Sequence, residues 1–123
     1  MNLSVYNDGY LDLYDIVEGE DEYGTPCQKI KARENGRVWY REMDSYYRTR
    51  YAYGTEDSRV QMVVRIPRPP KGTSWGTVTD KNVCVIDGKQ LKVFDAGIET
   101  TKYGVEELEI VLISPSAEYE VVK

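Results

Sequence analysis

The chain has 123 residues, of which 41% are hydrophobic and 30% are charged. This length suits a single domain, and the composition excludes a disordered polar chain. A membrane span is also excluded, since no apolar run approaches the ~18 residues that one requires. The first residues lack the basic and apolar segments of a secretory signal, so we expect intracellular synthesis.

Histidine is absent, whereas tyrosine occurs 11 times. The lack of histidine removes the commonest general acid or base and the commonest metal ligand. We therefore expect no catalytic site, no metal and no cofactor. The two cysteines, Cys27 and Cys84, are far apart and lack a CxxC partner, so we expect both to be buried thiols.

Charge is segregated along the chain, whose net charge is -5. Residues 1–24 hold seven acids and no base, residues 25–81 hold twelve bases and six acids, and residues 82–123 hold four bases and eight acids. The middle segment is thus basic and both ends are acidic. This asymmetry predicts either an electropositive binding face or complementarity between copies, unless folding mixes the charges.

In the first third of the chain the periodicity predicts strands. Tyr10–Val17 alternates as a strand, and Glu18–Pro26 has the glycines, proline and carboxylates of a loop. The loop lacks the ligand spacing of a calcium-binding EF-hand, so we interpret it as a solvated acidic turn. Two further strands, Gln28–Arg33 and Arg37–Met43, are predicted to form a hairpin around Asn35-Gly36, because both residues tolerate positive φ.

The second half of the chain contains the clearest alternation. Arg59–Ile66 places Val60, Met62, Val64 and Ile66 on one face, and Pro67-Arg68-Pro69-Pro70 ends it. Asp87-Gly88 predicts a tight type I′ turn between strands at Val83–Ile86 and Lys89–Phe94.

The last predicted strand is Val105–Ile113, with Leu108, Ile110 and Leu112 facing one way and Glu107, Glu109 and Val111 the other. Ala117–Lys123 is either a tail or one added strand. Six or seven short strands with hairpin turns predict an all-β fold, namely a single small antiparallel barrel or sandwich over residues 1–123 with one short helix and long loops. We favour the β-barrel, because closure would remove exposed strand edges. Residues 1–9 would be an N-terminal arm, 67–81 a long mobile loop and 114–123 a C-terminal tail.

The segment from Asp44 to Gly54 fits two conformations. As a helix it would be capped by Asp44 or Ser45 and ended by Gly54, whereas as a strand it would place its tyrosines on one face. We favour a short helix.

Aromatic and arginine side chains concentrate around the same segment. We favour a protein interface, because tyrosine, tryptophan and arginine dominate interface energetics. The two other interpretations are ordinary half-buried tyrosines with solvated arginines and a site that binds nucleic acid directly. The candidate interface residues are Trp39, Tyr40, Arg41, Tyr46, Tyr47, Arg48, Arg50, Tyr51 and Tyr53.

The order of several short motifs resembles the head-closure (head-completion) connector proteins of long-tailed bacteriophages and prophages. The resemblance runs roughly from Tyr10 to Ile113. Its motifs are Asp21-Glu22-Tyr23-Gly24-Thr25-Pro26, Val38-Trp39-Tyr40-Arg41-Glu42-Met43, the Val60–Ile66 strand, Ile86-Asp87-Gly88-Lys89 and Glu107-Leu108-Glu109-Ile110.

The resemblance implies a structural β-barrel, commonly a ring of twelve copies, beneath the portal and adaptor rings of a filled capsid. It would close the DNA-filled head and provide a docking surface for tail terminator or tail tube proteins, with DNA passing through the channel without sequence-specific binding. The protein would lie in the virion neck, and in the host cytoplasm before assembly, with no membrane partner.

A long excursion between barrel strands would form the plug of such a channel. We favour residues 67–81 over Asp44–Ser58 for this role. The candidate loop residues are Pro67, Arg68, Pro70, Lys71, Gly72, Trp75, Gly76 and Lys81. Two alternative functions are a tail-completion protein of the same neck and a small β-barrel that binds nucleic acid.

Overall fold

A computed structural model describes residues 6–43, 60–68 and 77–122 of the chain. These residues form strands and no helix, which confirms the predicted all-β class. The seven strands are β1 (Gly9–Glu20), β2 (Pro26–Glu42), β3 (Val60–Pro67), β4 (Asn82–Ile86), β5 (Lys89–Thr100), β6 (Glu106–Ile113) and β7 (Glu120–Val121).

Six of these strands are joined edge to edge in a closed ring of pairings. The order is β1-β4-β5-β6-β3-β2, and β2 pairs back onto β1. All six pairings in the ring are antiparallel, as predicted. The exception lies outside the ring, where β7 pairs with β2 in parallel. Ala117–Lys123 therefore contributes a strand, the second of the two alternatives that its sequence allowed.

The main core lies inside the ring and follows the alternation of the strands. Leu108, Ile110 and Leu112 of β6 pack there, as predicted, against Val64 and Ile66 of β3. The complete buried cluster is Leu11, Leu13, Tyr40, Val64, Ile66, Cys84, Ile86, Leu91, Val93, Leu108, Ile110 and Leu112. Every one of these side chains is less than a tenth exposed, so burial of apolar surface holds the ring together.

The predicted position of Val60 on the same face as Met62 is wrong. The register between β3 and β6 shifts between Val60 and Met62. This shift turns Val60 to the outer side of the sheet, where it packs with Val63, Val111 and Ile113. A local irregularity in pairing thus overrides the period of two that the sequence shows.

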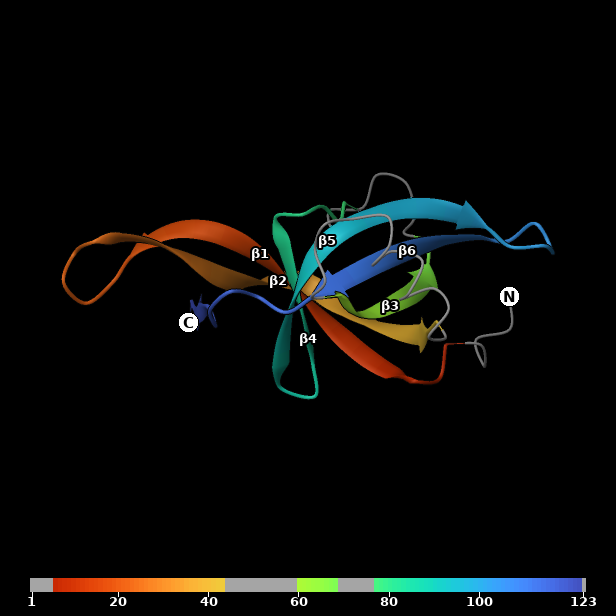
Figure 1. Ribbon diagram of the computed structural model, residues 1–123, viewed down its shortest axis with the longest axis horizontal. Helices are drawn as coiled ribbons and strands as arrows, with labels where there is room; N and C mark the ends of the chain where they lie inside the picture. The colour runs from red at the N-terminus through yellow and green to blue at the C-terminus, as the bar shows by residue number, and fades with distance from the viewer. Residues whose placement is uncertain (1–5, 44–59, 69–76, 123) are drawn as a thin grey trace.

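Two hairpins extend beyond the ring toward opposite ends of the longest axis (Figure 1). We call them the β1–β2 arm and the β5–β6 arm. β1 pairs with β4 only from Asp12 to Asp15, and from Val17 to Glu20 β2 is the only described strand that pairs with it. β5 likewise continues past its pairing with β4 and stays paired with β6 as far as Thr100. The predicted loop at Glu18–Pro26 is therefore shorter, because Glu18 to Glu20 continue the strand.

The hairpin predicted at Asn35-Gly36 is wrong, since β2 is one continuous strand there. Asp12 of β1 pairs with Arg37 and Tyr14 pairs with Ala32, so residues 33–36 form a bulge opposite a single residue of β1. Asn35 adopts a φ of 55° in this bulge. Of the two residues only Asn35 takes a positive φ, and it does so in a bulge rather than in a turn.

The turn predicted at Asp87-Gly88 is confirmed. Asp87 has a φ of 51° and Gly88 a φ of 77°, the two positive values of a type I′ turn, and the pair joins β4 directly to β5. Positive φ at both central residues matches the twist of the flanking strands.

The two cysteines differ in burial. Cys84 lies in the core, and burial raises the pKa of its thiol to about 12. Cys27 is only half-buried, so the prediction of a buried thiol is wrong for this residue. Cys27 lies near the tip of the β1–β2 arm, where the two strands have no core to cover them. The short helix predicted within residues 44–54 lies outside the described residues, as does most of the 67–81 loop.

Candidate functional site

An exposed aromatic cluster lies at the end of β1 and β2 opposite to the arm tip. Tyr10 and Trp39 are direct cross-strand partners, and their ring centroids are 5.7 Å apart in an edge-to-face arrangement. The guanidinium carbon of Arg37 lies 4.1 Å from the centroid of the Tyr10 ring. Tyr10 is 42% exposed and Trp39 is 58% exposed. We call these three residues the Tyr10–Trp39 cluster.

Arg37 is held in this position by Asp12, its cross-strand partner. The Arg37 Nε donates to Asp12 Oδ1 at 2.8 Å, and Nη2 donates to Oδ2 at 3.2 Å. The hydrogen bonds to Asp12 raise the pKa of Arg37. Asp12 uses only two of the five N–H donors of the guanidinium, so Arg37 can still bind another acceptor.

A cavity of about 480 Å³ opens beside the cluster. This volume falls within the ~300–1,000 Å³ range of ligand pockets. Its described lining residues are Tyr6, Asn7, Arg37, Val38, Trp39 and Pro67. Four of these six contribute aromatic or aliphatic surface, so the hollow suits an apolar side chain more than a charged one.

A buried ionic cluster lies on the outer face of β2, β3 and β6. Arg41 of β2 pairs with Arg65 of β3, which pairs in turn with Glu109 of β6. Glu107 accepts from Arg41 Nη2 at 2.6 Å and from Arg65 Nη1 at 3.3 Å, and Arg65 Nε donates to Glu109 at 3.0 Å. Both glutamate side chains are 2% exposed. Two carboxylates thus neutralise two neighbouring arginines, which allows both arginines to lie side by side on the paired strands β2 and β3.

Tyr6 covers this cluster from the N-terminal side. Its hydroxyl donates to Glu107 Oε2 at 2.5 Å, and the residue is 3% exposed. The backbone N–H of Asp8 bonds to the Tyr40 carbonyl at 3.1 Å, which holds the segment against the end of β2. Burial, together with the hydrogen bond to Glu107, raises the pKa of Tyr6 from 10.0 to about 12.

The raised pKa predicts a specific alkaline response. Because the folded-state pKa of Tyr6 exceeds the unfolded value, its stabilising contribution is complete below pH 10 and is lost as the pH rises toward about 12. In urea unfolding at a series of pH values, the stability difference between the wild type and Tyr6→Phe should stay constant to about pH 9 and then shrink. Tyr103→Phe, at an exposed position, serves as the control and should show no such change. A Tyr6→Phe difference that persists unchanged to pH 12 would contradict the assignment.

The tips of the two arms are closed by equivalent five-residue turns. In the β1–β2 arm, Asp21 Oδ1 accepts from the backbone N–H groups of Tyr23 and Thr25, both at 2.9 Å. In the β5–β6 arm, Thr101 Oγ1 accepts from Tyr103 at 3.3 Å and from Val105 at 3.2 Å. The fourth residue of each turn is a glycine of positive φ, 78° at Gly24 and 80° at Gly104. Each therefore presents a tyrosine on a rigid tip, Tyr23 at 84% exposure and Tyr103 at 81%.

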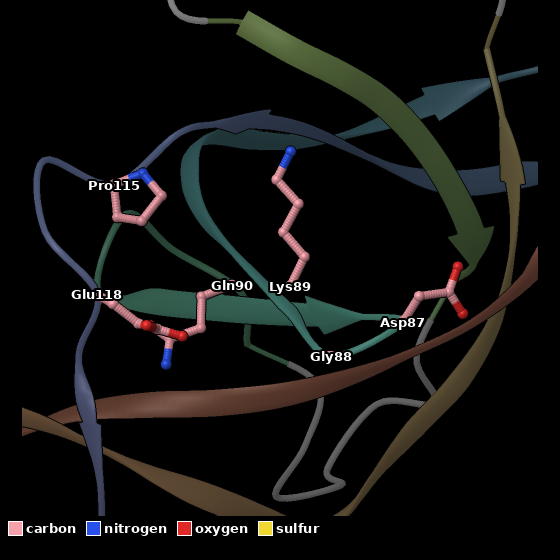
Figure 2. A pocket seen from close by; sticks show the side chains of 6 residues that line it. All are labelled: Asp87, Gly88, Lys89, Gln90, Pro115 and Glu118. Carbon is pink, nitrogen blue, oxygen red and sulfur yellow. The ribbon is translucent and has the colours of Figure 1, made fainter.

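A second hollow, of about 370 Å³, lies beside the β4–β5 turn (Figure 2). Its described lining residues are Asp87, Gly88, Lys89, Gln90, Pro115 and Glu118. The Gln90 amide is engaged at both ends, since it donates to the Tyr119 carbonyl and accepts from the Tyr119 N–H, each at 2.8 Å. Figure 2 shows Lys89 pointing away from Gln90 and Glu118. These groups do not converge on a ligand position, and the main role of Gln90 is to fix the chain ahead of β7.

The structure separates the three predicted interface residues of β2. Trp39 is exposed, Tyr40 lies in the core, and Arg41 belongs to the buried ionic cluster with its side chain 34% exposed. Successive side chains of a strand point to opposite faces, so three consecutive residues cannot form one surface. The other predicted interface residues lie outside the described chain, namely Tyr46, Tyr47, Arg48, Arg50, Tyr51 and Tyr53.

The predicted loop of residues 67–81 is described only near its ends. Pro67 ends β3 and lines the cavity, and Arg68 forms an ion pair with Glu106. At the other end the Lys81 carbonyl accepts from the Ile16 N–H at 3.0 Å. Pro70, Lys71, Gly72, Trp75 and Gly76 lie outside the described residues.

Sequence reasoning missed Tyr6, Tyr10 and Arg37 as members of the site. Tyr10 and Arg37 meet Trp39 only through the register of β1 with β2, and that register depends on the bulge at residues 33–36. The Tyr-Gly pair occurs three times, at Tyr23-Gly24, Tyr53-Gly54 and Tyr103-Gly104, and the first and last of these mark the matching arm tips.

No protein-family model matches this chain, and no curated protein matches it. Among residues 6–43, 60–68 and 77–122, no helix has the length and hydropathy needed to cross a bilayer. Within the same ranges, no three acidic or cysteine side chains are grouped closely enough to hold a metal ion.

Proposed function

We propose that the protein is a structural component of the neck of a long-tailed bacteriophage or prophage. It is a small β-barrel that assembles as a ring beneath the portal and adaptor rings, closes the DNA-filled head and offers the tail a docking surface. The closed order of strand pairings supports the barrel, since a ring of six strands with its core inside leaves few unpaired edges.

The motifs that carry the resemblance to head-closure connectors each have a place in this fold. Asp21–Pro26 supplies the turn of the β1–β2 arm, and Ile86–Lys89 supplies the tight turn between β4 and β5. Val38–Met43 carries the exposed Trp39 and the partly exposed Arg41, and Glu107–Ile110 carries the two buried glutamates. The motifs therefore lie at positions that determine the barrel and its projections.

The observation that carries the proposal is the Tyr10–Trp39 cluster beside its cavity. Large aromatic side chains are costly to expose, and patches of them beside arginine mark interaction surfaces. A connector needs such surfaces toward neighbours and toward the rings above and below, and its function requires no bond-making chemistry. The ion pairs on the outer face of the sheet link β2, β3 and β6, which suits a rigid building block.

Electron microscopy of phage particles that lack this protein tests the proposal. We expect heads that have lost their DNA, and free tails beside them, because nothing seals the portal after packaging. Adding back the purified protein before DNA is lost should restore joined particles. Full, stable heads beside finished but unjoined tails would instead indicate a tail-completion role and would overturn head closure.

A nucleic-acid-binding function predicts different behaviour in a simpler measurement. On a phosphate-rich column the proposed connector, with a sequence pI of about 4.8, should flow through at low salt. Strong retention that falls steeply as salt increases would contradict the connector and favour nucleic-acid binding.

A further inference from the structure

The tip of the β1–β2 arm carries a cluster of negatively charged side chains. From Glu18 to Cys27 the chain holds four carboxylates and no base. Glu18, Glu20 and Glu22 are exposed, and none of them has an ion-pair partner in the part of the chain that the structure describes. The tip therefore combines an exposed tyrosine with three carboxylates that remain available to a cation.

The Tyr10–Trp39 cluster has the complementary properties. Its cavity is lined mainly by apolar groups, and Arg37 lies at the rim with a side chain that is 62% exposed. Because Asp12 engages only the Nε and one terminal nitrogen, the guanidinium retains donors for a second carboxylate. An aromatic ring flanked by carboxylates thus matches an apolar hollow flanked by an arginine.

The two features lie at opposite ends of the same hairpin. Tyr10 pairs with Trp39 at one end of β1 and β2, and Asp21–Thr25 closes the other end. Ten residues of extended strand separate Tyr10 from Glu20, a span of roughly 33 Å. The arm therefore cannot reach the cavity of its own chain, but it can reach that of another copy.

We propose that the acidic tip of the β1–β2 arm, led by Tyr23, inserts into the cavity beside Trp39 of a second copy of this chain. The contact is head-to-tail, so each copy offers one arm and one cavity, and repetition of the contact closes a ring when the rotation between copies allows it. The turn is already rigid through its Asp21 hydrogen bonds, which lowers the entropy lost on docking. This inference rests on the proposed function for the ring and specifies which surfaces of neighbouring copies meet.

The test uses a photo-reactive phenylalanine analogue in place of Tyr23, in the purified full-length chain at high concentration. We expect light to join two copies, with the bond mapped by mass spectrometry to the cavity residues Val38, Trp39 or Pro67. The same analogue in place of Tyr103 is the matched control, since Tyr103 has an equivalent turn and similar exposure but no comparable acidic cluster. Equal yields from both positions, or no bond between copies from position 23, would overturn the proposal.

Self-association of variants gives a second, independent measurement. In sedimentation equilibrium, Tyr23→Ala and Trp39→Ala should each weaken association about tenfold, and the double variant should be little weaker than either one, since both remove the same contact. Tyr103→Ala should change association less than about twofold. Effects of Tyr23→Ala and Trp39→Ala that simply multiply would overturn the contact.

Failure of the inference can be distinguished from failure of the proposed function. If the protein closes heads but the arm docks elsewhere, particles lacking it still lose DNA while position 23 forms bonds to the adaptor or to a tail protein. If the contact between copies exists but the protein has another role, purified chains form the mapped bond while particles lacking the protein keep their DNA.

Discussion

Replacing Glu107 with alanine should lower the free energy of unfolding by roughly 3–5 kcal/mol, the cost of leaving a buried charge without its partner. Glu107 accepts hydrogen bonds from Tyr6, Arg41 and Arg65 while its side chain is 2% exposed. Its removal leaves two arginines on neighbouring strands with only Glu109 to neutralise them. Urea unfolding followed by circular dichroism measures the change.

Glu106 provides the matched control for this prediction. It precedes Glu107 at the exposed start of β6, where it forms an ion pair with Arg68. Because solvent screens such pairs, Glu106→Ala should cost at most about 1 kcal/mol. If Glu107→Ala cannot be purified folded, Glu107→Gln keeps hydrogen-bonding atoms and should show an intermediate loss. Equal, small effects at positions 106 and 107 would show that the ionic cluster does not stabilise the sheet.

Replacing Gly36 with alanine should destabilise the fold by roughly 1–3 kcal/mol, because the added methyl group meets backbone atoms that cannot move aside. A Cβ at this position would lie 2.9 Å from the carbonyl oxygen of Arg33 and 3.0 Å from that of Leu13. Arg33 belongs to the bulge, and Leu13 is the β1 residue opposite it; this bulge sets the register of Tyr10 with Trp39. Thermal or urea unfolding measures the loss.

Gly97 is the matched control, since it also lies in a strand but an added Cβ would meet nothing within 4 Å. Gly97→Ala should be neutral or should stabilise by roughly 0.5–1 kcal/mol, because alanine loses less conformational freedom on folding. A Gly36→Ala variant as stable as Gly97→Ala would contradict the tight packing of the bulge.

The elements that could be predicted from the sequence are those determined by local pattern. β3 and β6 alternate clearly, and Asp87-Gly88 permits few conformations other than the turn it forms. Asn35-Gly36 carries the same kind of signal, but positive φ suits a bulge as well as a turn, and only the pairing of β2 with β1 decides between them. The arms also extend further than predicted, because exposed acidic residues can continue a strand that has a partner but no core.

The candidate site could be predicted only in part, for a related reason. Trp39 was identifiable from its residue type and neighbours, whereas Tyr10 and Arg37 join it through a register that no local pattern reveals. Alternation correctly places Glu107 on the outer face of β6, but that face is covered by Tyr6 and two arginines. Whether the outer face of a strand is buried depends on segments that are distant in the sequence, so the alternation of residues along that strand does not predict it.

The hydrogen bonds that close the tip of the β5–β6 arm all lie within Thr101–Val105, and the described residues outside the turn contribute none of them. Such a closed unit can be lengthened or exchanged without disturbing the strands that carry it. A short peptide tag inserted between Tyr103 and Gly104 would therefore place a visible marker at the tip of the β5–β6 arm of each molecule. In particle images, that marker would report the direction in which every copy points.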